Sequence, residues 1–200
     1  STRLYMFGNR LHQINPLISC LHALVEVNFS GNELADLPPM LRHLAQLQHL
    51  QLSKNRFQFF PEVLAQLGPN LVSLTLAWNS IKVIPPMVCD FSRIEELNLS
   101  YNMITQAQNL VRLHKLTTLH LASNNIARMI SLARMSSLTC LTLNHNPINL
   151  FPASFGNGND RLKVMTIDSM TRASLPPCYM NLDFWFFTPP SSEEVFERPL

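Results

Sequence analysis

Three side chains with the chemistry of a catalytic site, Glu96, His120 and Cys140, stand in the middle of the chain. A cysteine nucleophile needs a base within hydrogen-bond reach and a donor that stabilises the oxyanion. No such arrangement emerges around Cys140. In a fold that stacks similar segments, any two residues on one face lie near each other, so proximity alone is weak support for catalysis. We therefore predict that these 200 residues hold no enzyme active site.

The seven histidines and four cysteines raise the question of a metal site. No histidine stands at ligand spacing from another histidine, a cysteine or a carboxylate on one strand or helix. We predict neither a metal nor another cofactor. Scattered cysteines without a C-x-x-C pair favour a reducing, intracellular compartment. The cysteines are Cys20, Cys89, Cys140 and Cys178.

Asparagine recurs every 22 to 24 residues, a regularity that composition alone does not produce. The stretch from residue 71 to 91, LVSLTLAWNSIKVIPPMVCDF, shows the surrounding pattern. Leu71, Leu74, Leu76 and Ile81 flank Asn79 in the arrangement L-x-x-L-x-L-x-x-N-x-L. The recurring asparagines are Asn9, Asn32, Asn55, Asn79, Asn102, Asn124 and Asn146, and Met170 stands in an eighth slot.

The repeated unit has a simple physical meaning. Its L-x-L part alternates with a period of two, which predicts a short strand whose leucines face one side. The asparagine ends the strand at a turn, where its amide can bond backbone groups of adjacent coils that would otherwise lack partners. Stacked units would form a parallel sheet and bury the leucines of each coil against its neighbours.

This pattern resembles the leucine-rich repeat superfamily over residues 2–175. The resemblance implies an α/β repeat solenoid: a curved, right-handed superhelix with a parallel concave sheet and an irregular, 3-10 or short helical convex side. About eight repeats would fill residues 1–175, the first truncated or uncapped, and residues 176–200 would form a C-terminal capping tail. Because a terminal coil needs a cover for its leucines, we expect either more chain before Ser1 or a partner at that end.

The parts of the units that return to the next strand fall into two groups. Five units place proline after an apolar anchor, as at residues 37–39 and 84–86. Proline favours an extended turn and excludes a helix at that residue, and these units resemble the typical intracellular repeats that end in L-P. Two later units lack the proline, and their segments 109–116 and 131–138 resemble the 22-residue intracellular class. In those two units we expect a helical turn.

The outward positions of the predicted sheet are mostly small, neutral and polar, so a few large residues stand out. Trp78 and Tyr101 precede the asparagines of successive coils and should lie about 5 Å apart. Exposed Trp and Tyr are enriched at binding hot spots; the alternative is that they fold over the asparagine turn and are merely half-buried. The candidate protein-binding residues of the concave face are Tyr5, His49, Trp78, Glu96, Tyr101, His120 and His145.

Four consecutive aromatic residues follow the last predicted coil. In an extended segment alternate side chains point to opposite sides, so one pair can cover the apolar end of the coil while the other pair stays outside. We expect a short helix around Val195 to cover the outer pair in part, or a downstream domain or partner to dock there. These candidate capping or protein-binding residues are Phe184, Trp185, Phe186 and Phe187.

Charged residues make up 14% of the chain, and the net charge is +2 with no basic block. No secretory signal, transmembrane run or lipidation motif is present within these residues. These features predict no nucleic-acid partner, no membrane and no small-molecule substrate. We therefore expect a non-catalytic interaction module in a cytoplasmic assembly, with a protein partner on the concave face or at the C-terminal end.

Two alternatives belong to other classes of protein. The chain could be the regulatory or sensing arm of a multidomain signalling enzyme whose catalytic domain lies outside this segment. The mass of the native polypeptide would distinguish this alternative from an interaction module without an enzyme domain. A secreted or cell-surface receptor ectodomain would need disulfides. A titration that finds four free thiols would dismiss this second alternative.

Overall fold

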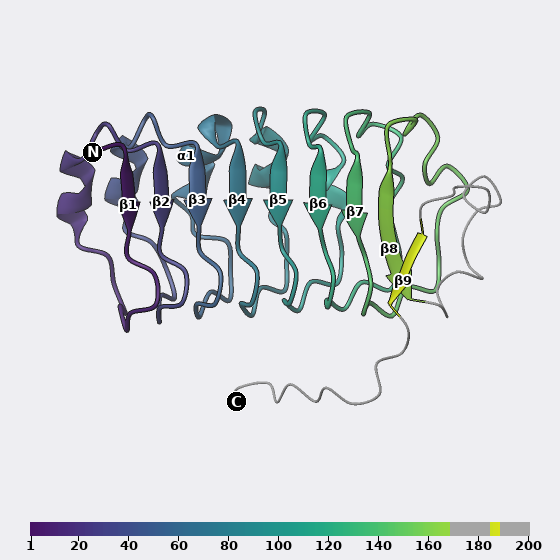
Figure 1. Ribbon diagram of the computed structural model, residues 1–200, viewed down its shortest axis with the longest axis horizontal. Coiled ribbons are helices and arrows are strands. Elements are labelled where there is room, and N and C mark those ends of the chain that lie inside the picture. Colours follow the sequence, from purple (N-terminus) through teal and green to yellow (C-terminus); the bar gives the residue numbers. More distant parts are fainter. Residues whose placement is uncertain (169–184, 189–200) are drawn as a thin grey trace.

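The computed structural model describes residues 1–168 and 185–188. Nine parallel strands form one sheet in chain order, so each coil pairs with the next (Figure 1). This open, curved sheet is the solenoid that the repeat pattern predicts. The strands are β1 (Arg3–Tyr5), β2 (Glu26–Asn28), β3 (His49–Gln51), β4 (Ser73–Thr75), β5 (Glu96–Asn98), β6 (Thr118–His120), β7 (Cys140–Thr142), β8 (Val164–Asp168) and β9 (Trp185–Thr188).

The register of the sheet follows the repeat. Leu74 at the centre of β4 pairs with Leu50 of β3 and Leu97 of β5, and all three side chains are buried. The flanking residues of each strand point outward, as a period of two requires. Equivalent positions therefore form continuous columns across the concave face.

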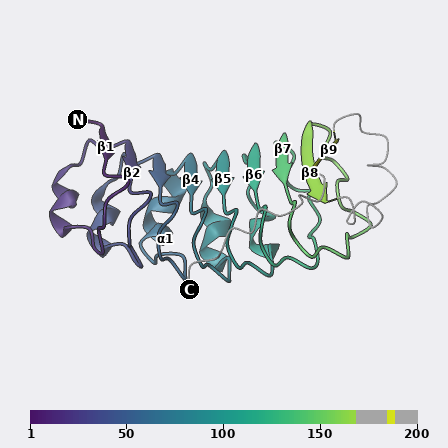
Figure 2. The same ribbon diagram turned by 60° about the horizontal axis from the view of Figure 1, so that its bottom comes forward.

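Short helices lie on the other side of the coils, away from the sheet (Figure 2). Helices of consecutive coils pack against one another along the stack. No helix in the described part of the chain is long and apolar enough to cross a bilayer. The helices are η1 (Pro16–Cys20), η2 (Pro39–His43), α1 (Leu64–Leu67), η3 (Gly68–Asn70), η4 (Pro86–Asp90) and η5 (Gln108–Leu110), where η denotes a 3-10 helix.

The 3-10 or short helices predicted for the convex side are confirmed, and two of them begin directly after an extended proline. Helices η2 and η4 begin at Pro39 and Pro86, the second proline of each pair. The fixed φ of proline suits the first helical position, where its missing N–H has no intrahelical acceptor in any case. The first proline of each pair, Pro38 or Pro85, remains extended, with ψ of 138° and 159°.

The expectation of a helical turn in the two units without proline is only partly met. In the first of them, η5 spans three residues, Gln108–Leu110. In segment 131–138, which the structure describes throughout, the chain forms turns and no helix. Without proline to set φ at the first position, little favours starting a helix that is too short to stabilise itself.

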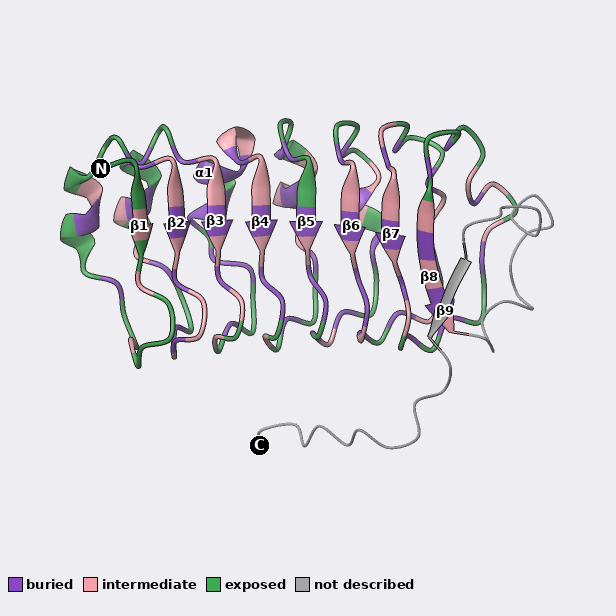
Figure 3. Ribbon diagram, viewed as in Figure 1, coloured by how far each residue is buried: buried purple, intermediate pink, exposed green. Residues whose placement is uncertain are grey.

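A single apolar core runs along the whole stack (Figure 3). Its largest fully buried side chains are the phenylalanines Phe29, Phe57, Phe91 and Phe155. At the N-terminal end, Leu4, Met6 and Leu11 pack against this core and stay partly buried. Each inner coil therefore buries its leucines between two neighbours, while the first coil has one.

The predicted aromatic run extends the sheet at its last strand. Trp185 pairs with Met165 and Phe187 with Ile167, so β9 lies parallel to β8. Phe184, the predicted helix around Val195 and the rest of the 176–200 tail lie outside the described residues. The capping role of this tail stays a prediction.

Candidate functional site

The asparagines connect each coil to the one before it. The Asn102 Oδ1 accepts the backbone N–H of Ile81 at 3.0 Å, and its Nδ2 donates to the carbonyls of Leu76 and Leu99 at 2.9 and 3.1 Å. The same three kinds of bond recur in the other inner coils; the asparagines that make them are Asn32, Asn55, Asn79, Asn124 and Asn146. Asn9 starts the series and bonds carbonyls of its own coil.

The residue before each asparagine adopts a left-handed backbone conformation. This turns its N–H towards the next coil: Trp78 donates to the carbonyl of Ser100 at 3.0 Å and Tyr101 to that of Ala122 at 2.8 Å. A left-handed residue other than glycine costs about 1–2 kcal/mol. The first two coils place Gly8 and Gly31 here, and the next five place Lys54, Trp78, Tyr101, Ser123 and His145, with φ between 54° and 59°.

Trp78 and Tyr101 form a parallel stack on the surface. Their ring centroids lie 3.8 Å apart with an interplanar angle of 9°, and the residues are 40% and 42% exposed. Lys54 extends the stack, because its Nζ lies 5.8 Å from the centroid of the Trp78 ring. Sequence reasoning missed Lys54, although its place directly before Asn55 is the same as that of the two aromatics.

The structure does not bring Tyr5, His49 or Glu96 into this stack. Tyr5 is exposed on β1, three coils or about 14 Å from Trp78. His49 and Glu96 stand at the first residue of their strands, whereas the stack lies beyond the strand ends. Glu96 accepts a hydrogen bond from the Ser73 hydroxyl at 3.3 Å.

The three residues of catalytic type do not assemble into a nucleophilic site. The His120 Nδ1 hydrogen-bonds with the Thr142 hydroxyl at 3.1 Å, while Cys140 pairs in register with Thr118. Burial raises the pKa of the Cys140 thiol. Burial also lowers the pKa of His120, and the negative charge of Glu96 offsets this only in part. Both groups are therefore neutral at pH 7, so this geometry does not activate the cysteine.

His145 is bound to the coil that follows it. Its backbone N–H donates to the Asp168 Oδ2 at 2.6 Å, and its Nδ1 lies 3.7 Å from the Asp168 Oδ1. In the preceding coils the corresponding backbone N–H donates its hydrogen bond to a backbone carbonyl of the next coil. Sequence reasoning did not assign Asp168 a role.

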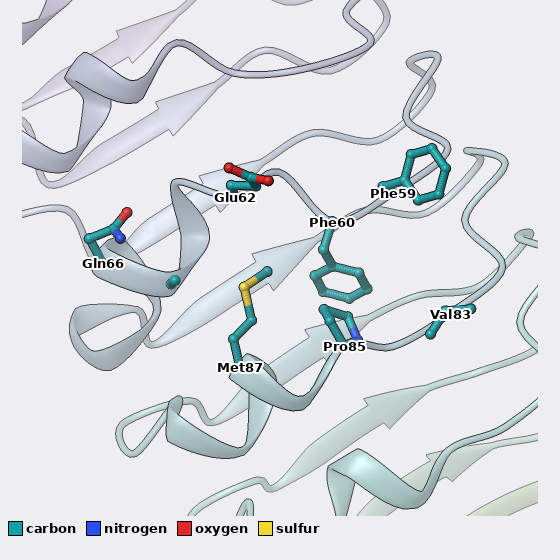
Figure 4. A pocket seen from close by; sticks show the side chains of 8 residues that line it. Phe59, Phe60, Glu62, Gln66, Val83, Pro85 and Met87 are labelled. Carbon is teal, nitrogen blue, oxygen red and sulfur yellow. The ribbon is translucent and has the colours of Figure 1, made fainter.

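A second candidate surface lies on the helical side. A shallow apolar pocket of about 470 Å³ lies between α1 and η4, with Glu62 and Gln66 at its side (Figure 4). Its exposed part includes Phe59, which is 75% exposed, and Val83. The repeat template says little about these return positions, so sequence reasoning had no signal for this pocket. In the described residues, no three His, Cys, Asp or Glu side chains gather as metal ligands.

Comparisons with known proteins agree with the fold. Models of the leucine-rich repeat family match residues 46–67 and 69–126. An LRR protein of Leptospira interrogans superposes with a TM-score of 0.78 and 27% identity, over 84% of this chain and 48% of that one. For an internalin of Listeria monocytogenes the TM-score is 0.73 and the identity 20%, over 92% of this chain and 53% of that one, which shows the fold alone.

The adenylate cyclase of Schizosaccharomyces pombe is 29% identical over 143 residues. The matched region is 58% of this chain and 8% of the cyclase, so the chain spans a small part of this relative. In the coils that the family models cover, the apolar register and the inter-coil asparagine bonds are complete. The matched repeats and the shared fold thus support a leucine-rich repeat protein.

Proposed function

We propose that this chain is the protein-binding part of a scaffold or adaptor subunit in a larger intracellular assembly. The centre of the contact is the surface stack of Trp78 and Tyr101, with Lys54 beside it. Leucine-rich repeat domains are generally interaction modules. Burial raises the pKa of the Cys140 thiol, and no three metal-ligand side chains gather in the described residues.

The exposure of the stacked rings carries this proposal. Two left-handed non-glycine residues cost about 2–4 kcal/mol together, whereas an aromatic pair contributes about 0.5–1.5 kcal/mol. Glycine fills the same position without strain at Gly31. Lys54, Ser123 and His145 carry the same strain, so it belongs to the position in the coil and not to the stack. Two large rings that stay 40% and 42% exposed are what favours a contact with a partner.

The Trp78→Ala/Tyr101→Ala double variant tests the proposal. We expect the affinity for the native partner to fall by more than about 30-fold, because hot-spot aromatics typically contribute more than 2 kcal/mol. The partner is identified by affinity purification with quantitative mass spectrometry, and its affinity is then measured by calorimetry.

Phe59→Ala is the matched control, since it removes an exposed aromatic from the helical side. It should leave the affinity within about twofold. If the double variant keeps full affinity while Phe59→Ala loses it, the partner binds at the pocket between α1 and η4 and the proposal is wrong.

A second candidate function is the regulatory arm of a multidomain signalling enzyme. The similarity to the S. pombe adenylate cyclase favours it, because the matched region is a small segment of a much longer enzyme. An intact mass of the native polypeptide close to 22.8 kDa would dismiss this candidate.

The intracellular part of the proposal rests on the cysteines. Cys20, Cys89 and Cys140 are free thiols. A titration of the native protein should find four thiols, whereas disulfides would point to a secreted or surface protein. The expected lack of a nucleic-acid, membrane or small-molecule partner stays a prediction.

A further inference from the structure

One exposed asparagine outside the repeated series is followed directly by glycine. In the whole chain, Asn157-Gly158 is the one place where these two residue types stand in that order. The pair lies in the turn of residues 153–158, within the return segment that leads from β7 to β8. Both residues are exposed, and neither belongs to the aromatic stack or lines the pocket beside Phe59. This turn is therefore a separate chemical feature of the molecule.

The turn is attached to the preceding coil on both sides of the pair. Before the pair, the Ser131 hydroxyl donates a hydrogen bond to the Ser154 carbonyl at 3.0 Å. After the pair, the Asn159 Nδ2 donates to the Met135 carbonyl at 2.9 Å, and Asn159 is buried. A change in the backbone between these two attachments would therefore act on the contact between the coils.

The reacting groups of the pair are accessible. The Gly158 N–H donates to no described residue, and the Asn157 side-chain amide makes no hydrogen bond to one. If Gly158 carried a Cβ, the described atom nearest to it from another part of the chain would be the Ala133 carbonyl oxygen, at 3.5 Å. Without that Cβ, the Gly158 nitrogen is open to the side chain before it. Groups of adjacent residues react readily because their proximity is already established.

We propose that Asn157 is a site of spontaneous deamidation. The Gly158 backbone nitrogen loses its proton to base in solution and attacks the Asn157 Cγ, which forms a new C–N bond. The bond from Cγ to Nδ2 breaks, and the nitrogen leaves as ammonia after it takes a proton from water. Water then adds to either carbonyl of the succinimide ring and opens it. The product is aspartate or isoaspartate, and the only co-reactant is water.

The two products change the turn in different ways. Each adds one carboxylate in place of a neutral amide, so the formal net charge falls from +2 to +1. Isoaspartate also routes the backbone through the side chain and lengthens it by one methylene. That displaces Asn159, whose Oδ1 is buried with no hydrogen-bond partner among the described residues and whose side chain therefore depends on its bond to Met135. Deamidation should thus weaken the attachment of this segment to the preceding coil.

Storage of the purified chain in mildly basic buffer tests the proposal, because base removes the proton of the attacking nitrogen. Mass spectrometry of peptides, after digestion in mildly acidic buffer, should show a gain of about 1 Da at residue 157 that grows with time. Asn125 is the internal control: it is also exposed, but the N–H of Ile126 after it donates to the Asn146 Oδ1 at 3.0 Å. We expect residue 157 to convert at least about tenfold faster than residue 125.

Asn157→Gln is the matched variant, because it keeps an exposed amide whose longer side chain closes the ring less readily. It should gain no mass at residue 157. Its Tm should stay constant during storage, whereas the Tm of the wild type should fall. Before storage, equal melting curves for the variant and the wild type check that the substitution leaves the fold intact.

Two results would overturn the proposal: no mass gain at residue 157 in the native chain, or an equal gain at residue 125. If residue 157 converts while the stored protein melts as the fresh protein does, the predicted effect on the contact between the coils is wrong. Both measurements use the chain alone, so they are independent of the proposed function and of its partner.

Discussion

The residue before each asparagine determines the character of the proposed binding surface. Its left-handed backbone is common to the first seven coils, while its side chain changes from coil to coil. Gly31 adds no side chain, Lys54 adds a cation, Trp78 and Tyr101 add a stack, and Ser123 adds a hydroxyl. Because the backbone is the same, side chains can be exchanged between coils to test each role.

The imidazole of His120 should make the protein less stable in mild acid. Burial lowers its pKa in the folded protein below the ordinary value of 6.5. As the pH falls below 6.5, the unfolded chain therefore takes up the proton before the folded protein does. The contribution of His120 to stability is complete above that pH and declines as the pH falls through the lower folded pKa.

Glu96→Gln should lower the pKa of His120 further, because it removes the negative charge that favours the imidazolium. An NMR titration of the ring measures the shift. Glu95→Gln is the control, since Glu95 is not among the groups that shift His120. A pKa that rises in Glu96→Gln, or that moves equally in both variants, would contradict this account.

At the scale of elements, the return segments depend on local chemistry more than on the repeat. Proline at the first helical position starts η2 and η4, and α1 begins three residues after Pro61. Gly68 follows α1 with right-handed φ and ψ of −52° and −40°, so no special backbone conformation explains it. The explanation is contact, because an added Cβ would lie 2.0 Å from the Phe91 ring of the next coil.

Gly68→Ala should therefore destabilise the protein by about 1–3 kcal/mol, the typical cost of overpacking a core. Urea unfolding measures it. In a Phe91→Leu background the same change should cost less, because the smaller side chain makes room for the methyl group. An equal cost in both backgrounds would show that the clash with Phe91 is not the cause.

At the scale of the whole molecule, each coil is stabilised by its neighbours rather than by contacts of its own. Its leucines are buried between adjacent coils, and its asparagine bonds the coil before it. A solenoid of this kind has a stability that depends on the contacts between neighbours. The loss of one inner asparagine therefore weakens a junction between coils as well as a single turn.

Asn102→Ala should lower the free energy of unfolding by about 1–3 kcal/mol, because buried backbone groups lose their partners. Asn9→Ala is the matched control: Asn9 is exposed and bonds only carbonyls of its own coil among the described residues. We expect it to cost less than half as much. Urea unfolding measures both variants. If Asn102→Ala and Asn9→Ala lose the same free energy of unfolding, the bonds between coils are not the source of the stability that Asn102 contributes.

The sequence by itself determined the coils, the parallel sheet and its register, because the period of the apolar residues states which face is buried. It also placed Trp78 and Tyr101 on successive coils, since both precede a repeated asparagine. Tertiary structure decided how their rings stack, because that depends on a left-handed backbone that the pattern does not encode.

Tertiary structure also decided the contacts at positions outside the repeat template. The bond from His145 to Asp168 and the pocket beside Phe59 depend on which side chains of different coils meet. The repeat period predicts which residues of a coil are buried. It does not predict which side chains of different coils are in contact. The sequence predicted 3-10 or short helices on the convex side but not that two of them begin at the second proline of a pair. Proline suits both an extended turn and a first helical position, so the residue type alone does not decide between them.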